Sequence, residues 1–147
     1  MTKKPIDLDH YFPYFLGTIS NRWTSTSSQL YLERFDIGIC EWRVLASIRA
    51  LGPVSAQEVR NLTSMDAAAI SRSLKKLEAK RLVELLEGRF VGRTKPFVMT
   101  ASGRKLYDRI SVHSRKREKT LLQDLSVDER DQLLVSLRKI LNRLEEL

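Results

Sequence analysis

The sequence has little cysteine and no long apolar run, and each shortage excludes a class of protein. Cys40 is the only cysteine in 147 residues, so a disulfide within one chain and a cysteine-rich zinc knuckle are both excluded. No run of 18 uncharged apolar residues is present, which argues against a membrane-spanning helix. Residues 1–20 lack the basic start, apolar stretch and cleavage site of a secretion signal, so we expect a cytoplasmic protein with no membrane partner.

The local signatures of many enzymes are also missing. The chain has no Gly-rich phosphate loop, no G-x-S-x-G elbow and no Cys and His pair close in sequence. His10 and His113 stand far apart, so three or four converging metal ligands are not expected. The sequence therefore predicts a protein that is not an enzyme and has no metal or cofactor. A catalytic site assembled only by the fold is the alternative that the sequence leaves open.

Lysine and arginine are abundant, and they are concentrated in one region. The formal net charge is +8. Residues 60–119 hold 16 Lys or Arg against 6 Asp or Glu, whereas the rest of the chain holds 10 against 12. A basic region between nearly neutral ends suits a protein in which one part binds a polyanion and the ends contact protein.

Apolar spacing predicts a mainly helical chain. Residues 8–32 repeat apolar side chains every three or four positions, which indicates one long helix. Ser126 and Glu129 have the spacing of a capping box, so a helix is expected to start there. That last helix carries an apolar stripe at alternating spacings of four and three residues, formed by Leu133, Leu137, Ile140, Leu144 and Leu147.

Two short helices and a hairpin are predicted in the middle of the chain. The first helix begins at Ser55, which has Glu58 three residues later, and the second runs from about residue 66 to residue 81. Only about three residues separate them, which is typical of a helix-turn-helix unit. Residues 82–86 and 96–100 are predicted to be strands around a glycine-containing loop. Because two strands alone are marginally stable, we expect this hairpin to lie against the helices.

The second short helix has one apolar face and one basic face. On a helical wheel, Leu74 and Leu77 fall within about 40° of Ile70, and the opposite side is centred on Arg72. Small residues at the helix start permit close approach to a surface, while Arg and Lys further along can reach phosphates or guanine edges. A solvated charged face is the simpler interpretation, but the adjoining helix and basic hairpin favour duplex DNA.

The hairpin tip adds three further cations, Arg89, Arg93 and Lys95, near two glycines. An Arg at the end of a flexible ribbon is suited to a narrow minor groove, where the negative potential is strongest. An ordinary solvated turn is the alternative. The complete set of predicted DNA contacts is Ala68, Ala69, Ser71, Arg72, Lys75, Lys76, Arg89, Arg93 and Lys95.

Two segments and the order of the elements carry a family resemblance. The segments are ISRSLKKLEAKRLVE, residues 70–84, and MTASGRKL, residues 99–106. They resemble the recognition helix with its following strand, and the LT-x-x-G-x-x-L signature, of the MarR family of bacterial transcription regulators. The resemblance implies a mainly α fold with a small β-hairpin wing, a winged helix-turn-helix protein that dimerises through its N- and C-terminal helices. Residues 1–34 and 102–147 are expected to form the helical dimerisation region and residues 35–101 the DNA-binding domain.

The resemblance also implies the partners. It implies a homodimer that binds a near-palindromic operator in double-stranded DNA, with the recognition helix in the major groove and the wing in the adjacent minor groove. We expect a repressor released by a small aromatic or anionic ligand. Candidate walls of a ligand pocket are Tyr11, Tyr14, Trp23 and Trp42, although core packing is the alternative use of each. The competing interpretations are a sequence-independent nucleoid or RNA-binding module and a winged helix that binds an acidic protein.

Some positions depart from the family pattern. Counting back from Thr100, Arg93 keeps the place of the wing Arg, but Val91 stands where an orienting Asp is usual. Arg81 stands where a Gly commonly ends the recognition helix, so the easy left-handed cap is expected to be lost. Some family members sense peroxide through one thiol, but Glu41 beside Cys40 opposes thiolate formation, so we predict a packed structural cysteine.

Overall fold

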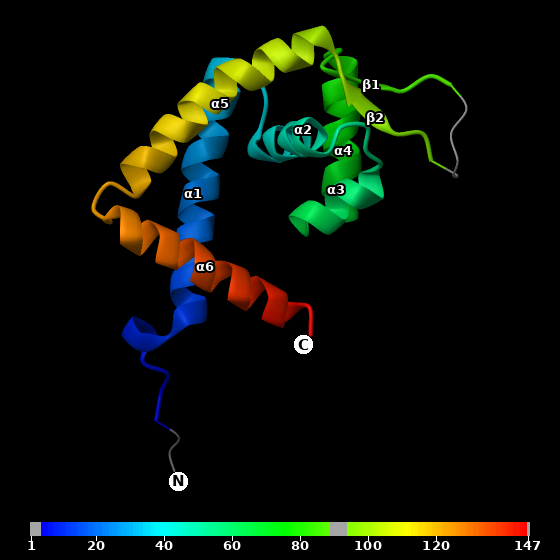
Figure 1. Ribbon diagram of the computed structural model, residues 1–147. Helices are drawn as coiled ribbons and strands as arrows, with labels where there is room; N and C mark the ends of the chain where they lie inside the picture. The colour runs from blue at the N-terminus through cyan, green and yellow to red at the C-terminus, as the bar shows by residue number, and fades with distance from the viewer. Residues whose placement is uncertain (1–3, 89–93, 147) are drawn as a thin grey trace. The chain divides into compact units, whose positions relative to one another are not determined.

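The computed structural model describes residues 4–88 and 94–146 (Figure 1). Its elements in chain order are a short 3-10 helix η1 (Leu8–His10), α1 (Phe12–Phe35), α2 (Ile39–Leu51), α3 (Ala56–Thr63), α4 (Ala67–Ala79), β1 (Val83–Leu85), β2 (Phe97–Met99), α5 (Ala101–Leu121) and α6 (Val127–Leu144). The chain divides into two compact units between Ile110 and Ser111. The prediction of a mainly helical chain with one small hairpin is confirmed. Within the described residues, no helix is long and apolar enough to cross a membrane.

Side-chain caps fix where the short helices begin. The Ser55 amide donates to Glu58 Oε2 at 2.8 Å and the Ser55 hydroxyl accepts from the Glu58 amide, so the predicted capping box of α3 is confirmed. Residues 64–66 separate α3 from α4, as predicted. Ser64 has a left-handed backbone with φ of 53°, and Asp66 caps α4 by accepting from the Ala69 amide at 3.0 Å. These contacts are local, which is why the sequence alone revealed this helix pair.

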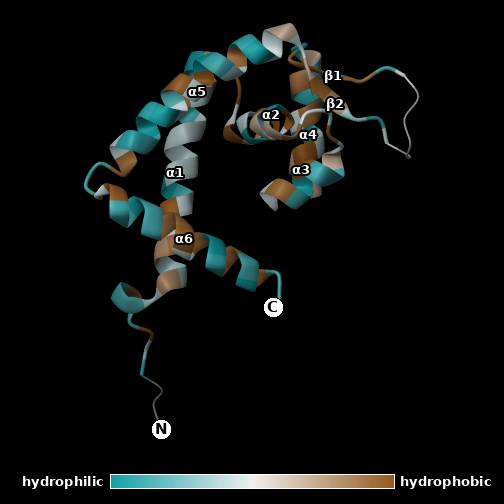
Figure 2. Ribbon diagram, in the orientation of Figure 1, coloured by the Kyte–Doolittle hydropathy of each residue, from teal (hydrophilic) through white to brown (hydrophobic). Residues whose placement is uncertain are grey.

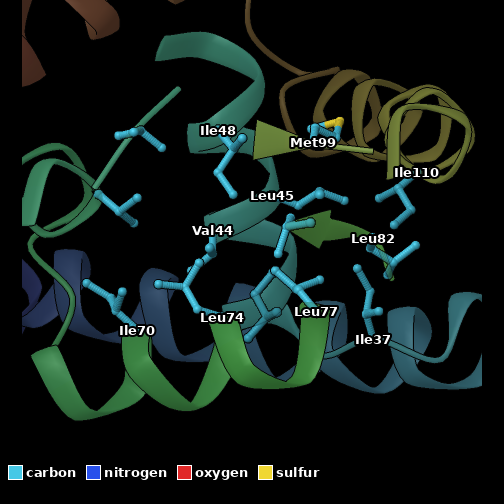
Figure 3. Close-up of a cluster of buried hydrophobic side chains, with 14 of the residues drawn as sticks. Ile37, Val44, Leu45, Ile48, Ile70, Leu74, Leu77, Leu82, Met99 and Ile110 are labelled. Atoms are coloured by element: carbon cyan, nitrogen blue, oxygen red, sulfur yellow. The ribbon is translucent and has the colours of Figure 1, made fainter. Parts of the chain in front are cut away.

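The core of the first unit lies where α2 and α4 meet. Figure 3 shows side chains of α2 and α4 directed towards each other, and further apolar residues from the α1–α2 connection, the strands and α5 complete the cluster. The labelled members are Ile37, Val44, Leu45, Ile48, Ile70, Leu74, Leu77, Leu82, Met99 and Ile110. Each fully buried aliphatic side chain contributes about 1.5 to 3 kcal/mol. This burial determines which face of α4 points inwards.

The hairpin is attached to the helices at its base. β1 and β2 pair antiparallel, with Val83 opposite Met99 and both side chains buried. Val54, just ahead of α3, forms an isolated bridge to Phe97 through two backbone hydrogen bonds of 3.1 and 2.8 Å. The expectation that the hairpin lies against the helices is confirmed.

Arg81 was expected to prevent a left-handed cap at the end of α4, and this prediction is wrong. Arg81 adopts the left-handed conformation, with φ of 55°, although it is not a glycine. The Leu82 amide donates to the Leu77 carbonyl at 2.9 Å and the Arg81 amide to the Glu78 carbonyl at 2.8 Å. This pair of bonds is a Schellman motif, so the cap forms despite the missing glycine. The tertiary position of Leu82, which is buried, outweighs the local cost of a left-handed arginine.

The start of α5 lies directly against the strand that follows α4. The Thr100 hydroxyl donates to the Leu82 carbonyl at 3.1 Å and accepts from the Gly103 amide at 3.0 Å. A Cβ at Gly103 would lie 2.0 Å from the Leu82 carbonyl oxygen. Gly103 therefore permits a close approach that no other residue allows.

Both terminal helices contain hydrophobic residues along their length (Figure 2), and many of these side chains are exposed in the described part of the chain. In the first half of α1, exposed fractions run from 43% to 57% for Phe12, Phe15, Leu16 and Ile19. The buried residues of α1, Ser27 and Tyr31, lie in its other half. In α6 no described residue is buried, and the exposed fraction of Leu141 reaches 58%. Within the described residues, each of these helices therefore has an apolar face that is partly exposed to solvent.

Candidate DNA-binding site

The core orients α4 so that its basic side faces solvent. Ile70, Ser73, Leu74 and Leu77 are the buried residues of α4. The predicted contacts on the opposite side are exposed, apart from Ala69, which is half-buried: Ala68, Ser71, Arg72, Lys75 and Lys76. The structure therefore brings together the α4 residues that the helical wheel grouped.

Arg72 and Lys75 lie on the outer side of α4 and have no ion-pair partner among the residues that the structure describes. Both side chains are exposed. Ala68 lies one turn before Arg72 and has only a methyl group, so the backbone there can approach another surface closely. Exposed cationic side chains such as Arg72 and Lys75, next to small residues, can contact phosphates and base edges in a groove of DNA.

Two further lysines, Lys76 in α4 and its C-cap Lys80, form ion pairs with carboxylates of the same chain. Lys76 Nζ lies 3.3 Å from Glu41 Oε1 at the start of α2. Lys80 Nζ lies 2.7 Å from Asp36 Oδ2 and also donates to the Asp36 carbonyl. Sequence reasoning assigned Lys76 to DNA and did not find its partner, because no local pattern links α4 to Glu41.

Of the three basic residues predicted at the hairpin tip, Lys95 lies within the residues that the structure describes. Lys95 is exposed just before β2. Arg89, Arg93 and Val91 lie outside the described residues, so their predicted roles and the wing geometry stay predictions.

A polar hollow beside α4 contains residues that sequence reasoning missed. It has a volume of about 610 Å³ and is lined by Gln57, Arg60, Asn61, Ser64, Met65 and Asp66. Gln57 Nε2 donates to Asn61 Oδ1 at 2.8 Å across one turn of α3, and the exposed Arg60 lies on the same helix. A helical wheel of α3 was the signal that would have found this polar face.

One described pKa shift lies close to this hollow. The backbone amide of Ser55, followed by its hydroxyl, holds the pKa of Glu58 below its ordinary value of 4.5. The charged Glu58 therefore stabilises the start of α3, and it accepts hydrogen bonds there rather than acting as a base.

A second, mostly apolar hollow of about 250 Å³ lies within the first unit. Its lining residues are Ile48, Arg49, Gly52, Pro53, Val98, Met99 and Arg104. Arg104 Nη1 donates to the Met99 carbonyl at 2.9 Å, and the Arg49 guanidinium lies 5.8 Å from the Tyr107 ring centroid. In the described residues neither arginine has a carboxylate partner.

The four aromatic residues predicted for a ligand pocket are not among the lining residues of that hollow. Tyr11 and Tyr14 are exposed at the start of α1, and the Tyr14 ring meets Phe15 edge to face. Trp23 is half-buried. Trp42 lies between Tyr31 and Tyr107, with ring centroids 6.0 and 5.3 Å away, which is an arrangement typical of core packing.

Cys40 and His10, the other residues considered for special chemistry, lie in unrelated parts of the fold. Cys40 is half-buried and packs against the core of the first unit. His10 pairs with Asp7 at 2.9 Å at the exposed N-terminal end. In residues 4–88 and 94–146 no group of three or more His, Cys, Asp or Glu is placed to hold a metal.

The fold and the site together define a winged helix-turn-helix protein of the DNA-binding class. The sequence profile of the MarR family matches residues 36–93. A MarR/EmrR family transcriptional regulator from Acinetobacter sp. ADP1 is 31% identical, with a TM-score of 0.90 over 97% of this chain and 100% of that one. The chain therefore belongs to the MarR family of transcription regulators.

Two further relatives agree with this assignment. The HTH-type transcriptional regulator YwoH of Bacillus subtilis is 29% identical over 112 residues, which cover 76% of this chain and 81% of YwoH. The S. aureus MepR–DNA complex is 26% identical, with a TM-score of 0.75 over 92% of this chain and 98% of that one.

Proposed function

We propose that this transcription regulator is a homodimeric, sequence-specific repressor that binds double-stranded DNA through the outer face of α4. The observation that carries the proposal is that Arg72 and Lys75 are exposed and unpaired in the described residues, beside small residues, on the helix whose other face is buried. In the proposed complex α4 enters the major groove. Ala68, Ala69 and Ser71 lie close to the DNA, and Arg72 and Lys75 reach base edges and phosphates.

The first helix of the pair and the wing add contacts to the DNA backbone. Arg60 projects from α3 beside the polar hollow, and the first helix of such a unit crosses the phosphate backbone. Lys95, with Arg89 and Arg93, is proposed to follow the adjacent minor groove. Relatedness to MepR, which was solved bound to DNA, supports duplex DNA as the partner.

Dimerisation is proposed through residues 1–34 and 102–147, with residues 35–101 as the DNA-binding domain. The support is the exposed apolar face of the first half of α1 and the exposed stripe of α6. A second copy would remove both from water at about 25 cal/mol per Å² of apolar surface. Twofold symmetry would place two copies of α4 about 34 Å apart, one turn of DNA, and the operator would be near-palindromic. Such a dimer represses from the cytoplasm by covering a promoter.

Release by a small anionic ligand completes the proposal. The 250 Å³ hollow is mostly apolar, and two of its lining residues, Arg49 and Arg104, lack carboxylate partners in the described residues. A small aromatic acid would match both features. It would weaken operator binding by its differential affinity for the two dimer conformations. Thermal-shift screening against phenolic acids is expected to find a stabilising acid whose effect is reduced in Arg49→Ala. A screen without hits would indicate a ligand-independent repressor.

Selection of duplexes from a random pool with the purified protein tests the DNA-binding proposal. We expect a symmetric motif with half-sites about one helical turn apart. A featureless pool with equal affinity for every duplex would indicate a sequence-independent nucleoid protein. Absence of binding to any duplex at low salt would favour a winged helix that binds an acidic protein.

A further inference from the structure

The basic residues of α4 and its C-cap Lys80 fall into two groups that differ in their partners. Taking Ile70 as zero, Lys75 and Arg72 lie at about 140° and 200° around the helix, while Lys76 and Lys80 lie at about 240° and 280°. The first group faces outwards and is unpaired in the described residues. The second group lies on the flank towards the start of α2, where each lysine meets a carboxylate.

Glu41 makes the more enclosed of these two contacts. Its side chain is only 10% exposed, whereas that of Lys76 is 67% exposed. Glu41 Oε2 accepts from the Gly38 amide at 2.6 Å and so caps α2, which leaves Oε1 to meet Lys76 Nζ at 3.3 Å. One carboxylate therefore connects the first turn of α2 to α4.

The Glu41 carboxylate occupies the space next to Gly38. A Cβ at Gly38 would lie 2.5 Å from Glu41 Oε2, so any side chain at Gly38 would displace the carboxylate. Lys80 adds a second connection nearby, from α4 to Asp36. Lys76 and Lys80, the C-cap of α4, are about one turn apart, so together they attach the end of α4 to Glu41 in the first turn of α2 and to Asp36, the C-cap of α1.

Apolar packing determines which face of α4 is buried. Because the hydrophobic effect itself has no directional preference, an ion pair at the edge of the helix adds a further restraint on small rotations about its axis. The side chains of a helix lie about 5 to 6 Å from its axis, so a rotation of about 15° moves them by about 1.5 Å. A shift of that size breaks a bidentate contact to a base edge, while a point contact to a phosphate tolerates it better. An ion pair that limits the rotation of α4, such as that between Lys76 and Glu41, therefore favours contacts to base edges.

We propose that Glu41 is a positioning residue for DNA binding, which holds Lys76 and thereby sets the rotation of α4 at which Arg72 and Lys75 meet the duplex. Lys76 then acts within the fold and not on the DNA. This inference rests on the proposed function, because it concerns how α4 is presented to its operator.

The sign of the effect of Glu41→Gln distinguishes this proposal from simple electrostatics. The substitution removes a negative charge close to the DNA-binding face, so electrostatics alone predicts tighter binding to every duplex. The positioning role predicts that operator binding becomes about three- to fivefold weaker, with a smaller change for a scrambled duplex. Lys76→Gln should give the same loss of operator preference, and the double variant should lose no more than either single one. Lys76→Arg keeps the pair and should retain the preference.

The experiment measures affinity by fluorescence anisotropy for the selected operator and a scrambled duplex, over a range of salt concentrations. Lys139→Gln, which removes one exposed positive charge from α6, is the matched control. Gly38→Ala, which displaces the carboxylate and keeps every charge, should reproduce the effect of Glu41→Gln. Circular dichroism confirms that each variant is folded at the assay temperature.

Two results would overturn the proposal, and they are distinguishable. If Glu41→Gln tightens binding or leaves the operator preference unchanged, while Lys76→Gln lowers the log–log salt slope by about 0.9, Lys76 is a phosphate contact and Glu41 positions nothing. If the unaltered protein shows no preference for any duplex, the proposed function fails first, and the inference fails with it.

Discussion

Replacing Gly103 by alanine is expected to destabilise the first unit, although alanine is the better helix former. Gly103 lies in the first turn of α5 and is buried. The added Cβ would lie 2.0 Å from the Leu82 carbonyl oxygen and 2.8 Å from Met99 Cγ. The methionine end can move, but the carbonyl belongs to backbone held between α4 and β1. The first turn of α5 must therefore move away from Leu82.

The size of the effect follows from the contacts that this movement disturbs. Overpacking a well-packed site costs about 1 to 3 kcal/mol. The Leu82 carbonyl accepts a hydrogen bond from the Thr100 amide at 3.1 Å, and losing this bond costs about 1 kcal/mol. Alanine returns about 1 kcal/mol through its helix propensity. The net loss in the free energy of unfolding is therefore about 1 to 3 kcal/mol.

Urea unfolding followed by circular dichroism measures this loss. Gly17→Ala is the matched control, because Gly17 also lies in a helix and its Cβ would meet nothing within 4 Å. It lies about 140° around α1 from Phe12, away from the exposed apolar face. The control should be stabilised by about 0.5 to 1 kcal/mol. If Gly103→Ala is as stable as the unaltered protein, the proposed close approach of α5 to Leu82 is wrong.

Further substitutions test other parts of the structure. Arg81→Gly should raise the free energy of unfolding by about 1 kcal/mol, because Arg81 has a left-handed backbone with φ of 55°. Arg81→Ala, the control, should give no such gain. Equal melting temperatures for the two variants would contradict a left-handed Arg81. The backbone amide of each cap serine holds the pKa values of Glu58 and Glu129 below 4.5. The two charged carboxylates therefore stabilise the folded state fully above pH 4.5, and this stabilisation is lost as the pH falls through their lowered pKa values. Melting temperatures between pH 6 and pH 3 should therefore fall less steeply in a Glu58→Gln and Glu129→Gln double variant, and parallel curves would refute this cause. Leu137→Lys on the stripe of α6 should yield monomers in light scattering, because a buried unpaired charge costs about 3 to 5 kcal/mol; an unchanged dimer would exclude this stripe from the interface.

The sequence predicted those features that depend on neighbours within a few residues. The capping pair of Ser55 and Glu58 and the three-residue turn before α4 are local, and the structure confirms both. The division of α4 into a buried and an exposed face is equally local, because it follows from helical periodicity around Ile70 and the apolar residues one turn apart.

The contacts that the sequence did not reveal join distant segments. Glu41 was considered only as a neighbour of Cys40, and no pattern in α2 indicates that its carboxylate meets Lys76 in α4. Arg81 was expected to lose the left-handed cap, since local propensity disfavours it. The structure retains that cap because the Leu82 amide bonds to the Leu77 carbonyl while the Leu82 side chain is buried. Tertiary packing, which local rules do not include, determined both outcomes.

Arg72→Ala, measured on the selected operator and on a scrambled duplex over a range of salt, tests most directly whether the outer face of α4 enters the groove. Operator binding is expected to weaken by about 1 to 3 kcal/mol, with a change of base preference at one position if Arg72 contacts a base. If Arg72 contacts only phosphate, both duplexes weaken alike and the salt slope falls by about 0.9. Arg138→Ala, which removes an exposed arginine from α6, should leave operator affinity nearly unchanged. If Arg72→Ala binds both duplexes with unchanged affinity, the outer face of α4 does not enter the DNA groove.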